Sequence, residues 1–254
     1  MVRNRGYHLA GTRLMKVKDV LSELESLATK DPESMAVRRG VPVETLLGVS
    51  TGEIRKLAKQ LGQNDRLAKQ LWRTGIHEAR SLAILVASFD TKTLGELGVW
   101  VSDIDSWDIC DHFAKKLAIE VADVSPLTTK WIASDALYTK RAGLALIANH
   151  CMKRKALESD ACESFLGQIK QCSTDERQHV KQASCWALRE LGKIDTGTHE
   201  MAIALALELQ ASADKTELWV GNCAYKELEA LVKIPERRRL IARTSKTASK
   251  YKNL

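Results

Sequence analysis

The sequence predicts an all-α fold, a HEAT-like helical-repeat solenoid, on three observations. Apolar residues recur with helical spacing along nearly the whole chain of 254 residues, and no stretch alternates convincingly as a strand would. Helix-capping signals recur, and glycine or proline breakers separate segments of about 10–17 residues. Stacked helical pairs of this size bury one continuous core and leave a concave face. We find no strict sequence period, so the repeat is degenerate, and a compact bundle is the structural alternative.

Capping signals and breakers place the individual helices. Ser50 and Ser173 each precede a glutamate by three residues, which is the capping-box pattern, and Asn64 or Asp65 suits the start of the next helix. Pro126 suits a first helical position. We expect helices over residues 17–30, 32–39, 50–61, 65–74, 77–88, 91–101, 106–122, 126–134, 136–150, 155–171, 174–192, 197–212, 215–231 and 235–250.

The composition is that of a folded, soluble helical protein, with 44% hydrophobic and 28% charged residues and only four prolines. No apolar run approaches the roughly 18 residues that span a membrane. No apolar core follows the N-terminal charges, so we expect no secretory signal and a cytoplasmic location. The six cysteines form no C-x-x-C pair and mostly fall on apolar faces, so we expect reduced core thiols. No interface signal is evident, and a monomer is expected.

Positive charge is concentrated at the two ends of the chain. Residues 233–254 hold eight Lys or Arg and one acid, a net charge of +7 that equals the charge of the whole chain. Residues 1–16 carry four basic residues and no acid. We therefore divide the chain into a basic N-terminal arm (1–16), a helical-repeat domain (17–232) and a basic C-terminal helix or tail (233–254). Such ends suit arms that approach a polyanion, and a solubilising tail is the alternative.

One predicted helix places an aromatic ring beside a carboxylate. Trp107 and Asp111 lie only about 40° apart on its surface, and the apolar stripe of that helix is centred roughly 80–120° away from them. Both side chains therefore point away from the core. On a chain this basic, such a pair suggests a surface that handles a nucleic acid. The apolar stripe comprises Cys110, Phe113, Leu117 and Val121.

A second polar face belongs to the helix predicted over residues 174–192. Trp186 lies about 120° from the centre of its buried stripe, with Gln182 and Arg189 close by. Aromatic rings stack on bases or sugars and arginine pairs with phosphate, although a tryptophan that covers a neighbouring repeat is the alternative. Arg141 falls among leucines on its helix. It needs either an acidic partner, as in a structural ion pair, or a groove to emerge into.

Several classes of site are excluded or receive no support. The chain has no P-loop and no G-x-G-x-x-G, G-x-S-x-G or H-E-x-x-H motif. His77 and Glu78 open an apolar helix and are expected to be structural, with the acid favoured by the helix dipole. The other histidines share no metal-ligand spacing, so we expect no metal and no cofactor.

Four segments together resemble the AlkD-type DNA alkylation-repair proteins, and the similarity runs from about residue 30 to residue 245. The resemblance implies a HEAT-like superhelix whose concave face binds duplex DNA. Active members of this family are monofunctional glycosylases that remove cationic alkylated purines such as 3-methyladenine and 7-methylguanine. The four segments, in chain order, are Gly75-Ile76-His77-Glu78-Ala79-Arg80, Asp105-Ser106-Trp107-Asp108-Ile109-Cys110-Asp111, Lys140-Arg141-Ala142 and Ala183-Ser184-Cys185-Trp186-Ala187-Leu188-Arg189-Glu190.

The resemblance also implies roles for individual residues. Trp107 matches a sugar-contacting tryptophan, Asp111 the catalytic carboxylate and Arg141 the arginine beside it. Trp186 matches the second groove tryptophan, and Arg189 matches a nearby phosphate-contacting position. We expect further DNA contacts from other polar and basic residues. These are Gln182, Lys115, Arg237, Arg238 and Arg239.

These roles fit a simple hydrolysis of alkylated bases in DNA. A purine alkylated at a ring nitrogen already carries positive charge, so it leaves without an acid. Asp111 would stabilise the oxocarbenium-like sugar and orient a water, Trp107 would pack against the deoxyribose, and Arg141 would keep the acid ionised. A non-catalytic paralogue that binds damaged or branched DNA is the first alternative. A HEAT-type protein–protein scaffold is the second.

Overall fold

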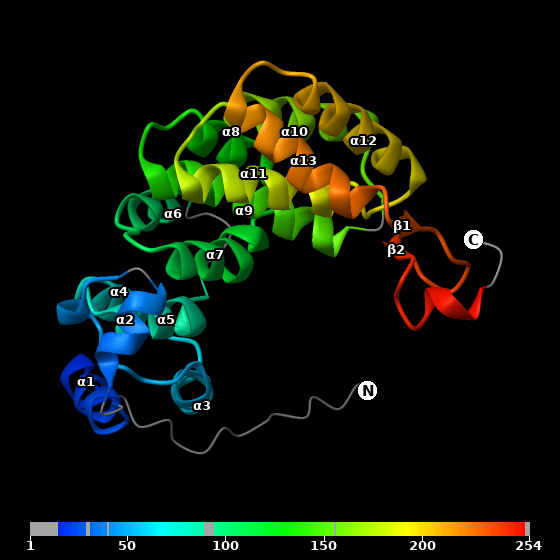
Figure 1. Ribbon diagram of the computed structural model, residues 1–254. Coiled ribbons are helices and arrows are strands. Elements are labelled where there is room, and N and C mark those ends of the chain that lie inside the picture. The colour runs from blue at the N-terminus through cyan, green and yellow to red at the C-terminus, as the bar shows by residue number, and fades with distance from the viewer. Residues whose placement is uncertain (1–14, 29–30, 40, 89–93, 155, 252–254) are drawn as a thin grey trace, which may run out of the picture. The chain divides into compact units, whose positions relative to one another are not determined.

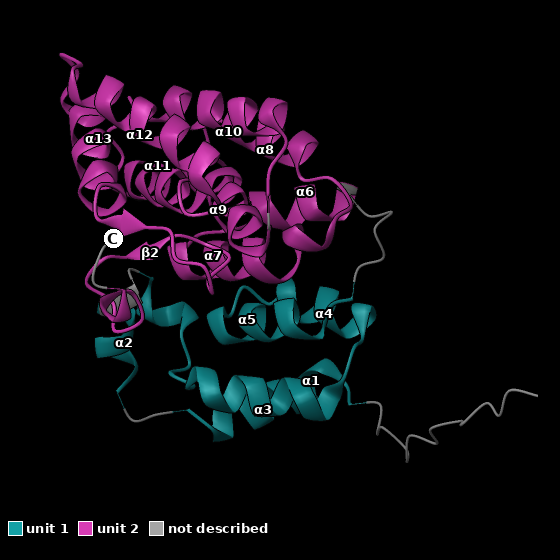
Figure 2. Ribbon diagram, turned by 90° about the vertical axis from the view of Figure 1, so that its right-hand side faces the viewer, with its two compact units in different colours: residues 1–89 teal, residues 90–254 magenta. Residues whose placement is uncertain are grey.

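Helices make up nearly all the regular structure of the described residues. The computed structural model describes residues 15–28, 31–39, 41–88, 94–154 and 156–251. The chain forms two compact units, residues 1–89 and 90–254 (Figure 2). Within the described residues no helix is both long and apolar enough to cross a membrane. The expected basic arm over residues 1–16 lies, except for its last two residues, outside the described part of the chain.

The first unit is a set of short helices whose starts follow the predicted caps. The Ser50 hydroxyl accepts the backbone N–H of Glu53, and the Asn64 side chain accepts the backbone N–H of Leu67, so both predicted helix starts are confirmed. The elements of this unit are α1 (Val17–Ser26), α2 (Pro32–Arg39), the 3-10 helix η1 (Val43–Thr45), α3 (Thr51–Leu61), α4 (Asp65–Trp72) and α5 (His77–Val86).

Glu78 has a different structural role from the one that its position in α5 suggested. Its side chain is fully buried and accepts hydrogen bonds from the backbone N–H groups of three successive residues, 47–49. A buried carboxylate needs such donors to remain in the interior. Glu78 therefore ties the loop before α3 to the first turn of α5.

The second unit consists of two layers of helices (Figure 1). Helices α7, α9, α11 and α13 pack side by side in chain order as one layer, and α8, α10 and α12 form the other. This arrangement confirms the prediction of stacked helical pairs. The elements are α6 (Leu94–Ser102), α7 (Trp107–Lys116), the 3-10 helix η2 (Ala118–Glu120), α8 (Ser125–Ile132), α9 (Leu137–Lys153), α10 (Ser159–Cys172), α11 (Gln178–Leu191), α12 (Thr196–Gln210) and α13 (Lys215–Leu228).

Helix α11 begins later than its sequence predicts. The predicted capping box at Ser173 is wrong, because that residue is fully buried and its hydroxyl donates to the carbonyl of Lys170 and to Glu217. The carboxylate of Asp175 accepts hydrogen bonds from both the backbone N–H and the guanidinium of Arg177. These bonds close a turn before the helix starts at Gln178.

The helix predicted over residues 235–250 is also wrong. Two short strands, β1 (Leu231–Val232) and β2 (Ile241–Ala242), pair antiparallel, and a 3-10 helix, η3 (Ala248–Lys250), follows. The backbone N–H of Leu240 donates to the carbonyl of Lys193, so contacts with the helical layer override the local helical pattern. A small core holds this segment together. It comprises Val232, Ile234 and Ala248, with Ile241 and Tyr251 packed against them.

Two of the six cysteines form a disulfide. Cys185 of α11 and Cys223 of α13 are joined, with their Cα atoms 6.2 Å apart and a sequence separation of 38. The expectation that every cysteine is a reduced thiol is therefore wrong for this pair. The partners come from different helices, so their sequence spacing gave no signal. The remaining cysteines, which are free and buried, are Cys110, Cys151, Cys162 and Cys172.

Candidate functional site

The candidate site is built around one carboxylate–guanidinium pair. Asp111 lies in the second turn of α7, and Arg141 lies near the start of α9. The guanidinium donates from Nε to Oδ1 over 3.0 Å and from Nη2 to Oδ2 over 2.8 Å, which is the bidentate geometry. The Arg141 side chain is 8% exposed and the Asp111 side chain 26%. The arginine is thus buried behind a carboxylate that solvent reaches.

Arg141 also connects three helices of the layer. Its Nη1 donates to the backbone carbonyl of His179 over 2.7 Å, and that residue lies in the first turn of α11. The need for a partner, inferred from an arginine among leucines, is therefore met by a carboxylate on α7 and a carbonyl on α11. The predicted acidic partner of Arg141 is confirmed as Asp111.

The electrostatics of Asp111 result from opposing effects. Burial raises the pKa of its carboxyl, while the hydrogen bonds and charge of Arg141 lower it, and the net pKa lies above the ordinary value. Each carboxylate oxygen has two acceptor positions, and the arginine occupies one on each. The free positions on the exposed side of Asp111 are available to a water or to a substrate with developing positive charge.

Two aromatic rings border this pair. The rings of Tyr138 and His179 lie 5.6 Å apart, centroid to centroid. Burial and the nearby Arg141 lower the pKa of His179, so its imidazole is neutral at pH 7. Sequence reasoning did not select either ring, because the contact joins α9 to α11 and has no local spacing. Trp107, in the first turn of α7, is half-buried as a surface contact residue would be.

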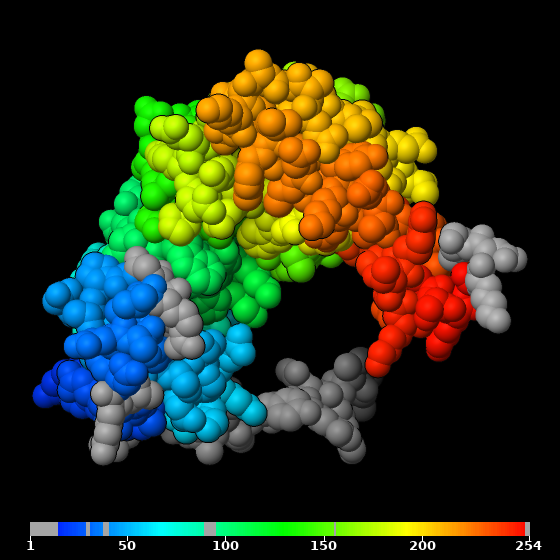
Figure 3. Space-filling view, viewed as in Figure 1, coloured from blue at the N-terminus to red at the C-terminus, as the bar shows by residue number. Residues whose placement is uncertain are grey.

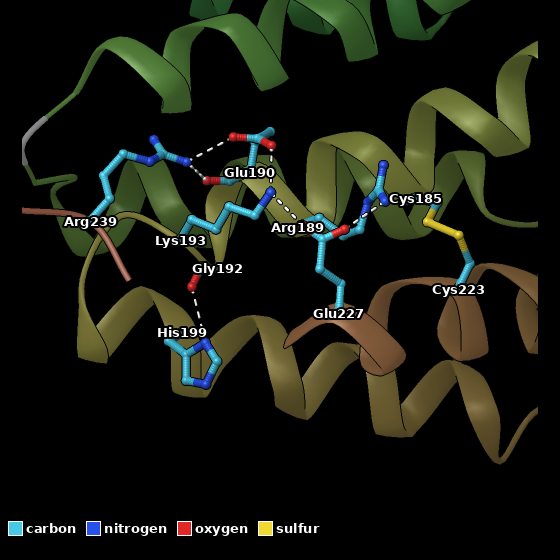
Figure 4. Close-up of polar contacts among 9 residues, drawn as sticks. All are labelled: Cys185, Arg189, Glu190, Gly192, Lys193, His199, Cys223, Glu227 and Arg239. Carbon is cyan, nitrogen blue, oxygen red and sulfur yellow. Dashed lines mark hydrogen bonds and ion pairs between the residues drawn. A yellow bond between two sulfur atoms is a disulfide. The ribbon is translucent and has the colours of Figure 1, made fainter. Parts of the chain in front are cut away.

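The polar face predicted on α11 is present, but its arginine is paired. Gln182 is exposed and Trp186 is half-buried. Arg189 donates from Nη1 to Glu227 of α13 over 2.7 Å. Glu227 also accepts from Lys193 over 2.5 Å, so one carboxylate holds two cations (Figure 4). Arg189 would therefore have to leave Glu227 in order to contact a phosphate.

Of the three C-terminal arginines expected to contact DNA, one is largely covered by other residues and two are exposed. Arg239 donates to the carbonyl and the carboxylate of Glu190 (Figure 4). It also donates to the carbonyl of Cys151. Its side chain thereby anchors the segment after α13 to α9 and α11. The expected DNA contact of Arg239 stays a prediction. Arg237 and Arg238 are exposed. Lys115, at the end of α7, is exposed as well.

A further aromatic residue of this layer was missed by the sequence reasoning. Trp219 of α13 is 37% exposed, and the ammonium of Lys181 on α11 lies 5.2 Å from the centroid of its ring. The signal available in the sequence was a tryptophan between lysines at helical spacing, at Lys215 and Lys226. No group of three or more side chains with metal-ligand chemistry gathers anywhere in the described residues.

The family of the chain follows from its sequence. A family described as DNA alkylation repair enzyme matches residues 20–225. The chain belongs to that family. The matched part contains the Asp111–Arg141 pair, Trp107 and the polar face of α11. Arg237, Arg238 and the C-terminal strands lie beyond it.

A solved structure has the same fold as this family member. Its title is "A new family of proteins related to the HEAT-like repeat DNA glycosylases with affinity for branched DNA structures". The two chains are 21% identical, the similarity covers 93% of each, and the TM-score is 0.67. The HEAT-like architecture predicted from the sequence is thus confirmed. No curated protein matches the chain.

Proposed function

We propose that this protein is a monofunctional DNA glycosylase that excises cationic alkylated purines, such as 3-methyladenine and 7-methylguanine, from duplex DNA. The observation that carries the proposal is the fixed, partly exposed carboxylate of Asp111 on its buried arginine. Membership of a DNA alkylation repair family supports the choice of substrate. A base that already carries positive charge leaves without being protonated, so the proposed reaction needs no leaving-group acid.

The proposed reaction needs only the carboxylate and a water. The bond between C1′ and the purine nitrogen breaks, and its electron pair leaves with the base, which becomes neutral. The sugar becomes an oxocarbenium-like cation beside the ionised Asp111, which stabilises the developing charge. A water held by Asp111 attacks C1′, and its proton passes to the carboxylate as the C1′–O bond forms. The products are a free base and an abasic site.

Trp107 and Arg141 support Asp111 in different ways. Trp107 precedes the carboxylate by one helical turn, so its ring borders the sugar that the carboxylate would approach and stabilises positive charge through its face. Arg141 acts as a positioning residue, because its two hydrogen bonds fix both oxygens of Asp111 and its charge favours the ionised form.

The remaining residues of the layer provide contacts to the DNA backbone. Trp186 and Gln182 present an aromatic ring and an amide on α11, and Lys115, Arg237 and Arg238 are exposed cations. Phosphate contacts of this kind position a protein on DNA without reading sequence. Arg189 joins them by exchanging its Glu227 carboxylate for a phosphate.

A second candidate function is binding of branched DNA without excision. The structural neighbour is described as having affinity for branched DNA structures, and it covers nearly all of this chain. A protein of this second kind would keep the basic surface and leave alkylated bases in place.

Base release separates the two functions. Duplex DNA treated with dimethyl sulfate is incubated with the full-length protein, and free methylated purines are separated from the polymer and identified. Release of free base with matching abasic sites supports the glycosylase. Salt-sensitive binding of three-way junctions with no base released contradicts it and supports the second function.

A further inference from the structure

Helix α13 presents an aromatic residue and cations on one exposed face. Lys215, Trp219, Asn222 and Lys226 are all exposed and follow one another at steps of three or four residues, and Leu218 is exposed beside Trp219. Leu218 and Trp219 are 38% and 37% exposed, which makes them two of the large hydrophobic side chains left in solvent. In Figure 3 this helix, in orange, forms open surface beside α11. We call Lys181, Lys215, Trp219 and Lys226 the α13 platform.

Three regularly spaced contacts between α11 and α13 hold the platform in place. Lys181 lies over the ring of Trp219, a disulfide joins Cys185 to Cys223, and Arg189 pairs with Glu227. The members of each contact are 38 residues apart in sequence, so the two helices run in one direction and meet at every turn. The ring is therefore fixed by its neighbouring helix while part of it stays in solvent.

An exposed tryptophan with an ammonium at its ring and further lysines on the same face fits one chemical partner. Every nucleobase has a π-face that stacks on an aromatic ring, and the phosphate beside it pairs with lysine. A paired base hides its faces in the helical stack, so an indole reaches only a base that is unpaired. Lys215 and Lys226 on the exposed face and Lys181 at the ring bring three cations to this surface, which favours a polyanion over an apolar protein partner.

We propose that the α13 platform binds a single-stranded DNA segment, with one unpaired base stacked on Trp219 and its phosphates on Lys181, Lys215 and Lys226. The proposal rests on the proposed function only in taking DNA as the ligand. The proposal adds a DNA contact outside the Asp111 site. It makes the preferred ligand a DNA in which a duplex adjoins an unpaired segment.

The packing of the layer fixes how far the unpaired segment lies from the site of excision. Three helix-to-helix steps separate α7, which carries Asp111, from α13. At 8–10 Å for each step, the separation is about 25–30 Å. Duplex DNA rises about 3.4 Å per base pair, so the unpaired segment is expected roughly eight base pairs from the lesion.

The test compares binding of two fluorescent DNAs by the full-length protein. One is a blunt duplex of 16 base pairs with a central 7-methylguanine, and the other carries in addition an eight-thymidine 3′ or 5′ overhang. Of the two overhang DNAs, 3′ and 5′, the one that wild-type protein binds more tightly is expected to bind about tenfold more tightly than the blunt duplex. One stacked base gives an effect of this size. Trp219→Ala is expected to remove that advantage, Trp219→Phe to keep most of it, and Lys181→Met to reduce it and its salt dependence.

Leu207→Ala provides the matched control, because Leu207 is an exposed apolar residue of α12 in the other layer. This variant is expected to behave as wild type. Equal affinity of wild-type protein for both DNAs, or an overhang preference that survives Trp219→Ala, overturns the proposal. Base release from the blunt duplex reports on the glycosylase separately, because neither Trp219 nor the overhang takes part in it.

Discussion

At the scale of single residues, the candidate site is the ion pair of Asp111 and Arg141, in which each side chain satisfies the charge of the other. Arg141 is buried, and Asp111 supplies both of its bidentate acceptors. The sequence predicted that Arg141 needs a partner, because an arginine on an apolar stripe is costly without one. The residues alone did not identify the partner, since the two positions are 30 residues apart and meet only when α7 packs on α9.

The pH dependence of excision is expected to report on this pair. In the proposed reaction Asp111 acts in its ionised form, so the rate of excision is expected to fall on the acid side as pH drops through the raised pKa of this carboxyl. Arg141 lowers that pKa, and Arg141→Gln removes the lowering effect of its charge. The acid limb of the single-turnover rate is therefore expected to move to higher pH in the variant. A limb at the wild-type position, in protein shown by circular dichroism to be folded, would contradict the role of Arg141.

Glu227 is expected to weaken DNA binding. Its carboxylate holds Arg189, which the proposed function places on a phosphate. It also pairs with Lys193, which Glu190 holds as well. Glu227→Gln removes the competing charge, so we expect affinity for duplex DNA to rise several-fold and the salt slope to steepen by about one phosphate contact. Affinity measured by titration from low to moderate salt checks this.

Glu208→Gln provides the control for Glu227→Gln. Glu208 of α12 pairs with Lys170 of α10, and both helices belong to the other layer. Glu208→Gln therefore changes the net charge of the protein by the same amount as Glu227→Gln. A rise in affinity of the same size in both variants would assign the effect to net charge and not to the release of Arg189.

At the scale of elements, local sequence signals predicted most of the helices. They gave wrong predictions where contacts between distant parts of the chain determine the structure. The caps at Ser50 and Asn64 depend on neighbours within three residues, and both were predicted. Ser173 has the same local pattern but donates to Glu217, which is 44 residues away, so no local rule could reveal its role. The segment after α13 likewise follows the contacts of Arg239 with α9 and α11.

The close approach of α12 and α13 depends on a glycine. A Cβ at Gly221 would lie 2.7 Å from the carbonyl oxygen of Ala206 and 2.7 Å from the backbone nitrogen of Gln210. Gly221→Ala is therefore expected to cost about 1–3 kcal/mol in the free energy of unfolding. Gly167 of α10 has nothing within 4 Å of such a Cβ, and Gly167→Ala is expected to stabilise by about 0.5–1 kcal/mol. The free energy of unfolding of both variants is measured by denaturant unfolding. Equal changes in the two variants would contradict the close packing of α12 on α13 at Gly221.

At the scale of the whole molecule, the net charge of +7 overstates how much positive charge is free to bind DNA. Arg239 is bound by carbonyls and Glu190, and the ammonium of Lys233 donates to the carbonyls of Arg237 and Arg238. The sequence correctly located the basic segment after residue 232. It did not show that part of this charge anchors the segment, because the anchoring carbonyls belong to helices far along the chain.

The helical-repeat fold was predictable because period and caps are repeated along the chain, whereas the division at residue 89 was not. Proteins of this family act on DNA damage, and the second unit carries the candidate carboxylate, its arginine and the α13 platform. The site residues that resemblance implied on α7 and α9 are brought together, while the contacts of Trp219 and Glu227 emerged only from the packing of α11 on α13.

The most direct test of the account is the rate at which Asp111→Asn releases base from a duplex with one 7-methylguanine, measured with enzyme in excess. We expect the rate to fall by about a hundredfold or more while the dissociation constant for the same DNA changes less than about threefold. Glu120→Gln, which neutralises an exposed carboxylate paired with Lys153, is expected to excise as wild type does. Excision by Asp111→Asn at the wild-type rate would contradict the assignment of Asp111 as the catalytic carboxylate.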